Sequence, residues 1–232
     1  MKMPEQTAPP AAPLGIFGGT FDPVHLGHLR LAEEATETLG LSSIRWIPAG
    51  QPAHRMVDNK LPQVSAQQRL EMVRLAIAGN PRFDLDAAEV EADQPSFTVP
   101  TLERLRHPDQ CGTQRPLVLL VGADAFAGLP DWHRWEEIFK LAHIAVAHRP
   151  GFPIDTGSLP ESLAGIYRTR YSTSPAALAE APAGRIVTFA MTQLAISATQ
   201  IRSLLANGRS PRYLLPDAVI AYIQSTFLYS PQ

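Results

Sequence analysis

The chain has 232 residues, of which 20 are lysine or arginine and 22 are aspartate or glutamate, so its formal net charge is −2 at pH 7. This near-neutral balance excludes a broad polyanion-binding surface, so we expect neither nucleic acid nor a membrane as a partner, and no apolar run approaches the roughly 18 residues of a membrane span. The single cysteine, Cys111, cannot form an internal disulfide, which favours a free thiol and a reducing, cytoplasmic location.

The first predicted segment is a flexible tail over residues 1–13, which hold four prolines and no apolar core of the signal-peptide type. Residues 14–232 are predicted to form one domain. Within this domain, short apolar runs that stop at turn residues predict buried strands. These runs cover residues 14–17, 44–47, 83–86, 117–121, 144–147 and 186–189.

Apolar residues at helical spacing predict helices between most of these strands. The predicted helices cover residues 26–40, 65–77, 98–105, 136–141, 197–207 and 217–223. Two of them begin at a capping-box pattern, at Ser65 and at Ser197, and another ends at Gly40, a residue type that commonly closes helices. Residues 152–184 show little periodicity, and we interpret them as a long loop or an irregular insertion.

The alternation of strands and helices along the whole chain predicts the fold class. It is typical of an α/β protein with a parallel sheet and helices on both faces, here one doubly wound, Rossmann-like domain. Ligands in such folds bind at the carboxyl ends of the strands. The loops that leave strand ends at residues 18–28, 122–135 and 190–202 are therefore the candidates for a functional site.

The loop at residues 18–28, with the sequence GGTFDPVHLGH, lies between a predicted strand and a predicted helix N-terminus. Its adjacent glycines, Gly18 and Gly19, let the backbone approach a ligand closely, and the helix start offers unpaired N–H groups to phosphate. His25 and His28 lie on one face of the first helical turn, where two imidazoles can stabilise charge that develops in phosphoryl-type transfer. The loop lacks the spacing of a dinucleotide fingerprint and of a Walker A loop.

The same eleven residues resemble the signature of the nucleotidylyltransferase superfamily, whose diagnostic core is His-x-Gly-His, and more narrowly that of bacterial nicotinate mononucleotide adenylyltransferases. Four further stretches are similar to the narrower family. They are WIPAGQPAHR at 46–55, SFTV at 96–99, GAD at 122–124 with LPDWHRW at 129–135, and ISATQIR at 196–202. The resemblance covers residues 14–223 in register, and five motifs in order are far more specific than any single one.

The resemblance implies a reaction. The family joins the phosphate of nicotinate mononucleotide to the α-phosphorus of ATP, releases pyrophosphate and forms nicotinate adenine dinucleotide, the precursor of NAD. It uses Mg²⁺, which we expect to be held mainly through the ATP phosphates, with no covalent enzyme intermediate; any metal ligand from the protein is unknown. The residues agree with this, because in-line transfer needs positioning and charge neutralisation more than a protein nucleophile. ATP and nicotinate mononucleotide are the implied partners, and assembly into a homo-oligomer is left open.

The resemblance also implies roles for individual residues. His25, His28 and Arg202 would be the catalytic residues that contact and neutralise the phosphates. The residues that would bind ATP are Gly18, Gly19, Thr20, Phe21, Gly122, Asp124, Arg149, Ser197 and Thr199. Those that would bind nicotinate mononucleotide are Arg55, Phe97, Thr98 and Trp132. Trp132 would stack on the nicotinate ring, and donors at Phe97 and Thr98 would favour the acid over the amide, since a carboxylate only accepts hydrogen bonds.

Several of these residues also have a purely structural interpretation. Ser197 and Asp124 are ordinary residue types for a helix N-cap, and Trp132 is a residue type that is highly buried on average. Arg55 can be interpreted as an exposed loop charge, and Arg202 as a solvated helix residue, although the motif favours a functional role for Arg202.

The chain departs from the family pattern at a few positions. Pro100 stands where relatives commonly have aspartate, Asp93-Gln94-Pro95 replaces a common Gly-Pro turn, and Arg55 replaces lysine. These differences concern the expected nicotinate pocket. The alternatives are another enzyme of the superfamily, such as a pantetheine-phosphate adenylyltransferase or a cytidylyltransferase, and a non-catalytic nucleotide-binding protein on the same fold. The segments 132–135 and 196–202 argue against the first, and the intact His25, His28 and Arg202 argue against the second.

Overall fold

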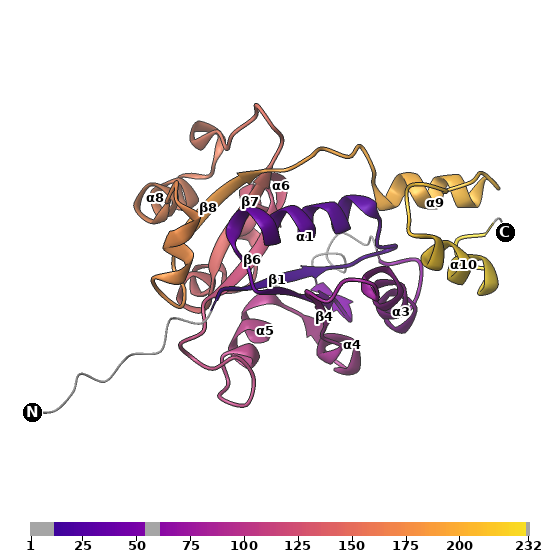
Figure 1. Ribbon diagram of the computed structural model, residues 1–232, viewed down its shortest axis with the longest axis horizontal. Coiled ribbons are helices and arrows are strands. Elements are labelled where there is room, and N and C mark those ends of the chain that lie inside the picture. The colour runs from indigo at the N-terminus through magenta and orange to yellow at the C-terminus, as the bar shows by residue number, and fades with distance from the viewer. Residues whose placement is uncertain (1–11, 54–60, 231–232) are drawn as a thin grey trace, which may run out of the picture.

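A parallel six-stranded sheet forms the centre of the computed structural model, which describes residues 12–53 and 61–230 (Figure 1). The strands lie in the order β4-β2-β1-β6-β7-β8. Their bounds are β1 Leu14–Gly19, β2 Ser43–Pro48, β4 Phe83–Leu85, β6 Leu117–Gly122, β7 His143–His148 and β8 Ile186–Ala190. A separate pair joins β3 (Gln51–Pro52) to β5 (Pro95–Ser96). From the central pair β1 and β6, the chain builds outward through β2 and β4 on one side and through β7 and β8 on the other. This arrangement confirms the predicted doubly wound α/β fold.

Helices cover both faces of this sheet, with α1 on one face and α5 on the other (Figure 1). The α-helices are α1 Leu26–Leu39, α3 Ala66–Ile77, α4 Ala88–Glu91, α5 Thr98–Leu105, α6 Ala123–Ala127, α7 Ile138–Leu141, α8 Glu161–Arg170, α9 Ala198–Ala206 and α10 Asp217–Ser225. Short 3₁₀ turns lie at Leu129–Asp131, Trp135–Glu137, Thr156–Ser158 and Pro175–Ala179. Within residues 12–53 and 61–230, none of the helices has the length and apolar character needed to cross a bilayer.

Strand β6 shows why the sheet is buried on both faces. Its side chains alternate, and Leu117, Leu119 and Val121 pack into one hydrophobic core, whereas Val118 and Leu120 pack into the other. All five are at most 5% exposed. The first core lies under α5, α6 and α8, and the second lies under α1, α3 and α10. The uninterrupted apolar run of β6 thus follows from its central place in a parallel sheet.

The helix ends follow the predicted signals. Gly40 closes α1 in the left-handed conformation, with φ at 63°, which costs glycine little because it has no Cβ. Ser65 and Gln68 form a reciprocal capping box at the start of α3. The second predicted capping box is only half formed, since Ser197 Oγ accepts a hydrogen bond from the Gln200 N–H without a return bond.

Residues 152–184 differ from the expectation of a structureless segment. They contain α8, whose inner face buries Leu163, Ala164 and Tyr167. This apolar stripe is short and is surrounded by serine, glycine and arginine, so the sequence pattern alone did not reveal it. The short helices α4 and α6 were also not predicted, and residues 1–11 of the expected tail lie outside the described part of the chain.

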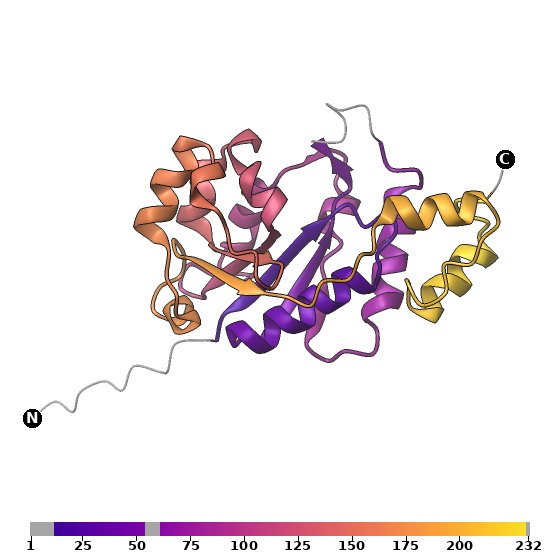
Figure 2. The ribbon, with the colours of Figure 1, turned by 90° about the horizontal axis from the view of Figure 1, so that it is seen from above.

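A long connection carries the chain from β8 across α1 to α9 (Figure 2). Glu34 on α1 anchors it, because the Glu34 carboxylate accepts hydrogen bonds from the Thr192 N–H at 2.7 Å and from Arg30 Nε at 2.5 Å. Glu34 is 8% exposed, so this contact is well shielded from water. It holds the beginning of this connection against α1.

Candidate active site

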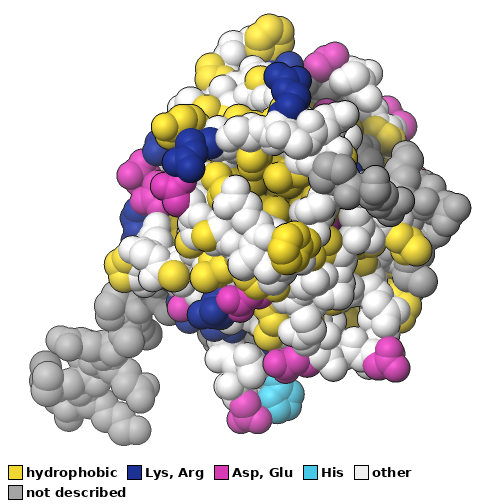
Figure 3. All heavy atoms as spheres, turned by 90° about the vertical axis from the view of Figure 1, so that its right-hand side faces the viewer, with side chains coloured by type: hydrophobic (Ala, Val, Ile, Leu, Met, Phe, Trp, Pro, Cys, Tyr) yellow, Lys and Arg dark blue, Asp and Glu magenta, His cyan; other side chains and the backbone are white. Residues whose placement is uncertain are grey.

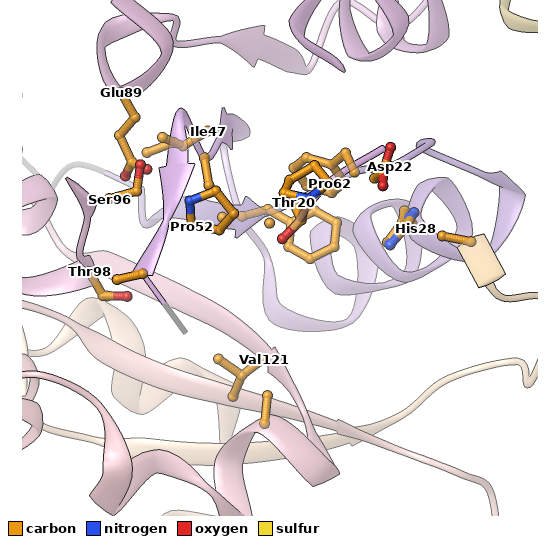
Figure 4. A pocket seen from close by; sticks show the side chains of 18 of the residues that line it. Thr20, Asp22, His28, Ile47, Pro52, Pro62, Glu89, Ser96, Thr98 and Val121 are labelled. Carbon is orange, nitrogen blue, oxygen red and sulfur yellow. The ribbon is translucent and has the colours of Figure 1, made fainter. Parts of the chain in front are cut away.

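A cavity of about 1000 Å³ opens at the carboxyl ends of the strands, as expected for this topology. Its walls come from the end of β1, the end of β6, the N-terminus of α5, the turns after α6, and the first turns of α9. In Figure 4, Asp22 and His28 lie at one end of this cavity, and Glu89, Ser96 and Thr98 lie at the other. Thr20 lies between the two groups.

His28 lines the cavity with a defined tautomer. The His25 main-chain N–H donates a hydrogen bond to His28 Nδ1 at 3.2 Å, so Nδ1 is the acceptor and a neutral His28 carries its proton on Nε2. The His25 ring stacks on His28, with ring centroids 3.7 Å apart. His28 can therefore donate from Nε2 while His25 supports the ring from behind.

Both histidines are neutral in the free protein at pH 7. Burial lowers the pKa of His25 to about 4, because the desolvated ring resists a positive charge. Burial and the neighbouring His25 lower the pKa of His28 well below its usual range. The imidazoles thus act as oriented dipoles and hydrogen-bond donors, and they add no net charge to the empty pocket.

We expect His25 to titrate with a midpoint near pH 4, against an ordinary pKa of 6.5, when its ring protons are followed by NMR. The folded pKa lies below the unfolded one, so between these values the unfolded chain binds a proton that the folded chain does not. The stability that neutral His25 contributes is complete above about pH 6.5 and is lost as the pH falls through about 4. Denaturation at pH 7 and pH 5 should show this loss, which should be smaller in His25→Gln. A midpoint near 6.5 would contradict the burial described here.

Arg202 brings a permanent positive charge to the same end of the cavity. Its Nη1 donates to the Asp22 main-chain oxygen at 2.7 Å, and its Nη2 donates to Thr199 Oγ1 at 3.3 Å. Its Nε is buried and has no hydrogen-bond partner among the described residues. A guanidinium with unused N–H groups beside a helix N-terminus is suited to binding phosphate.

Arg69 is a buried residue beside the cavity whose contacts the sequence analysis missed. It lies on α3, is 1% exposed, and donates hydrogen bonds to the main-chain oxygens of Thr20, Ala49 and Gly50 at 2.6–2.8 Å. Burial lowers its pKa, and the nearby Asp22 acts in the opposite direction. Arg69 therefore ties the loop after β1 to the loop after β2. Its position on the buried stripe of α3, beside Met72 and Val73, was the available signal.

The opposite end of the cavity is lined by Ser96, Phe97, Thr98 and Trp132 together with Glu89. Ser96 Oγ accepts a hydrogen bond from the Gly50 N–H at 3.0 Å, which joins this wall to the loop after β2. Burial raises the pKa of Glu89. Trp132 is half-buried and faces the cavity, so it presents a flat aromatic surface there. Aromatic faces of this kind commonly stack on heterocyclic rings.

The structure brings together most of the predicted site residues. Those that line the cavity are Gly18, Gly19, Thr20, Phe21, His28, Phe97, Thr98, Gly122, Trp132, Thr199 and Arg202. His25 lies behind His28, and Asp124, Arg149 and Ser197 are exposed residues outside the lining. Gly122, not Asp124, is the N-cap of α6, whereas Ser197 does cap α9. Arg55 lies outside the described residues.

The described residues do not form a dedicated metal centre. Within residues 12–53 and 61–230 there is no group of three or more His, Cys, Asp or Glu side chains placed to hold a metal ion. Asp22, which lines the same cavity, accepts hydrogen bonds from the Gln63 N–H and from the Tyr229 hydroxyl.

Comparisons with known proteins place this chain in a family. The cytidylyltransferase-like family model matches residues 16–204. A protein of Dechloromonas aromatica, named as a probable nicotinate-nucleotide adenylyltransferase, is 66% identical over 217 residues, which are 94% of this chain and 97% of that protein. The chain belongs to the nicotinate-nucleotide adenylyltransferase family. A Pseudomonas putida protein of the same name is 49% identical over 93% of this chain and 94% of its own length.

The fold of the family is also found among solved structures. The Plasmodium falciparum nicotinic acid mononucleotide adenylyltransferase, solved as a complex with NaAD, matches with a TM-score of 0.67 and covers 94% of this chain and 97% of that one. At 16% sequence identity, this likeness bears on the fold alone. As a member of the nicotinate-nucleotide adenylyltransferase family, the chain is a nucleotidyltransferase.

Proposed function

We propose that the protein transfers the adenylyl group of ATP to nicotinate mononucleotide, yielding nicotinate adenine dinucleotide and pyrophosphate, a step of NAD biosynthesis. The observation that carries this proposal is the pairing of two different ends in one cavity. His28 on α1 and Arg202 on α9 form an end suited to phosphates. Trp132, Phe97 and Thr98 form an end suited to a flat heterocycle with a carboxylate.

The chemistry follows from charge and position. A phosphate oxygen of nicotinate mononucleotide attacks the α-phosphorus of ATP, the new P–O bond forms, and the bond to the β-phosphate oxygen breaks as pyrophosphate leaves. No protein nucleophile takes part. His28 would donate its Nε2–H to a phosphate oxygen as charge develops there, and Arg202 would neutralise the departing pyrophosphate. His25 would hold the ring of His28 in place.

Mg²⁺ belongs to this proposal as a partner of ATP. It would be held mainly by the phosphate oxygens, since Asp22 is already engaged by neighbouring donors and Mg²⁺ commonly binds through substrate phosphates with few protein ligands. When bound, the ion would neutralise part of the phosphate charge. A cytoplasmic location remains a prediction.

The preference for an acid substrate depends on the N-terminus of α5. Phe97 is its N-cap, and the first N–H groups of a helix lack partners within the helix. These donors suit a carboxylate, whereas a carboxamide would bring its own N–H groups toward them. We therefore expect nicotinate mononucleotide to be preferred over nicotinamide mononucleotide.

Pyrophosphate release tests the proposal directly. The purified protein with Mg²⁺ and ATP would be offered nicotinate mononucleotide, nicotinamide mononucleotide and phosphopantetheine in separate reactions. Release is expected to be fastest with nicotinate mononucleotide. Release with phosphopantetheine alone would overturn the proposed substrate, and no release with any of the three would overturn the proposed activity.

A further inference from the structure

The carboxylate of Asp22 sits at a buried junction beside the phosphate end of the cavity. The residue is 7% exposed. Its Oδ1 accepts a hydrogen bond from the Tyr229 hydroxyl at 2.6 Å, and its Oδ2 accepts one from the Gln63 N–H at 3.0 Å. Arg202 Nη1 lies 3.6 Å from Oδ2 but donates its hydrogen bond to the main-chain oxygen of the same aspartate.

Tyr229 reaches this junction from the far end of the chain, 207 residues away in sequence. It follows α10 and adopts a left-handed backbone, with φ at 57°, which is unfavourable for a bulky side chain unless the surroundings impose it. Two residues earlier, Phe227 also has a positive φ but points outward and is 80% exposed. Apolar side chains are visible among charged ones on the face that carries α9 and α10 (Figure 3). The turn thus presents one aromatic residue to solvent and directs the other inward.

The hydrogen bonds to the Asp22 carboxylate affect which acceptors the N–H groups of Arg202 can bind. A free carboxylate oxygen beside a guanidinium forms a close, bidentate ion pair when nothing else holds it. Here neutral donors bind both oxygens of Asp22. Arg202 Nη1 stays 3.6 Å from Oδ2 and donates to the main-chain oxygen instead. Burial, more than any other cause, raises the pKa of Tyr229. Its phenol therefore remains a hydrogen-bond donor at neutral pH.

We propose that Tyr229 is a positioning residue for the adenylyl transfer: by holding one oxygen of Asp22, it keeps Arg202 free to bind the phosphates of ATP. This inference rests on the proposed function of the cavity and deepens it. The match to the cytidylyltransferase-like family model ends at residue 204, so Tyr229 lies outside the residues that this model matches. Tyr229 acts through Asp22 and Arg202 and needs no contact with substrate.

The test compares the Tyr229→Phe variant with the wild-type protein, both at full length. Phenylalanine keeps the ring, which packs in the hydrophobic core, and removes only the hydroxyl. We expect kcat/KM for ATP to fall about tenfold, the scale of losing a hydrogen bond to a charged group, while the KM for nicotinate mononucleotide changes less than about twofold. Tyr213→Phe is the matched control, because that side chain is 81% exposed and its loss of a hydroxyl should leave both constants unchanged.

A double-mutant cycle with Arg202→Ala separates positioning from a structural role. If Tyr229 acts through Arg202, Tyr229→Phe should have no further effect once Arg202 is alanine. The inference would be overturned if Tyr229→Phe lowered kcat/KM for ATP equally with and without Arg202, or left it unchanged. It would also be overturned if the variant lost efficiency with both substrates in parallel and had a lowered Tm. If Arg202→Ala alone leaves ATP use intact, the proposed role of Arg202 itself fails. If wild-type protein releases no pyrophosphate, the proposed function fails first.

Discussion

Replacing His28 with alanine is expected to lower kcat by a factor of about 10²–10³, which is the scale of losing one preorganised donor that stabilises transition-state charge. The fold should remain intact, because His28 is only half-buried and lines the cavity. The ring supplies a single Nε2–H donor, whose direction is set by the hydrogen bond from the His25 N–H to Nδ1. Alanine removes that donor, and no other side chain of the described site stands in its place.

Steady-state kinetics at saturating ATP and nicotinate mononucleotide would measure this effect, with circular dichroism to confirm folding. His107→Ala provides a matched control, since that histidine side chain is 64% exposed and lies outside the cavity lining. Its kcat should match the wild type. A folded His28→Ala variant whose kcat stays within about threefold of the wild type would remove His28 from the mechanism.

Replacing Gly50 with alanine is expected to destabilise the protein by about 3 kcal/mol or more, at the upper end of the range for overpacking. A Cβ at this position would lie 2.0 Å from the main-chain oxygen of Glu89, and a backbone atom cannot move aside as a flexible side chain does. Gly50 also holds the site together, because its N–H donates to Ser96 Oγ and its oxygen accepts from Arg69. Activity should therefore fall together with stability.

Urea denaturation would measure the change in the free energy of unfolding. Gly79→Ala is the control, because no heavy atom lies within 4 Å of the position that its Cβ would occupy. That variant should unfold like the wild type. If Gly50→Ala were equally stable, the close approach of the two backbones at Glu89 would be wrong.

The fold was largely predictable because its signals are local. The apolar run of β6 and the caps at Gly40 and Ser65 depend on residues next to each other in the chain, and the structure confirms each of them. The longest element that was missed is α8, whose buried stripe of Leu163, Ala164 and Tyr167 is too short to stand out. Helices of this kind are stabilised mainly by tertiary packing, which leaves only a weak pattern in the sequence.

The site was predictable where its residues belong to compact motifs, as at His28, Thr98 and Arg202, which the structure brings to one cavity. It was not predictable where the chemistry depends on burial or on contacts between distant segments. The lowered pKa of His25 and of His28 follows from desolvation in the fold, which no pattern of residues specifies.

By itself, the sequence determined the parallel α/β architecture and the position of the loop with two histidines at residues 18–28, because strand burial, helix caps and short motifs are encoded by neighbouring residues. Only the tertiary structure decided that Arg69 forms hydrogen bonds to the loops after β1 and β2, and that the Tyr229 hydroxyl donates a hydrogen bond to Asp22. Those contacts join segments that are 49 and 207 residues apart. Their partners are selected by packing in three dimensions, and a buried polar group must find whichever partner the fold supplies.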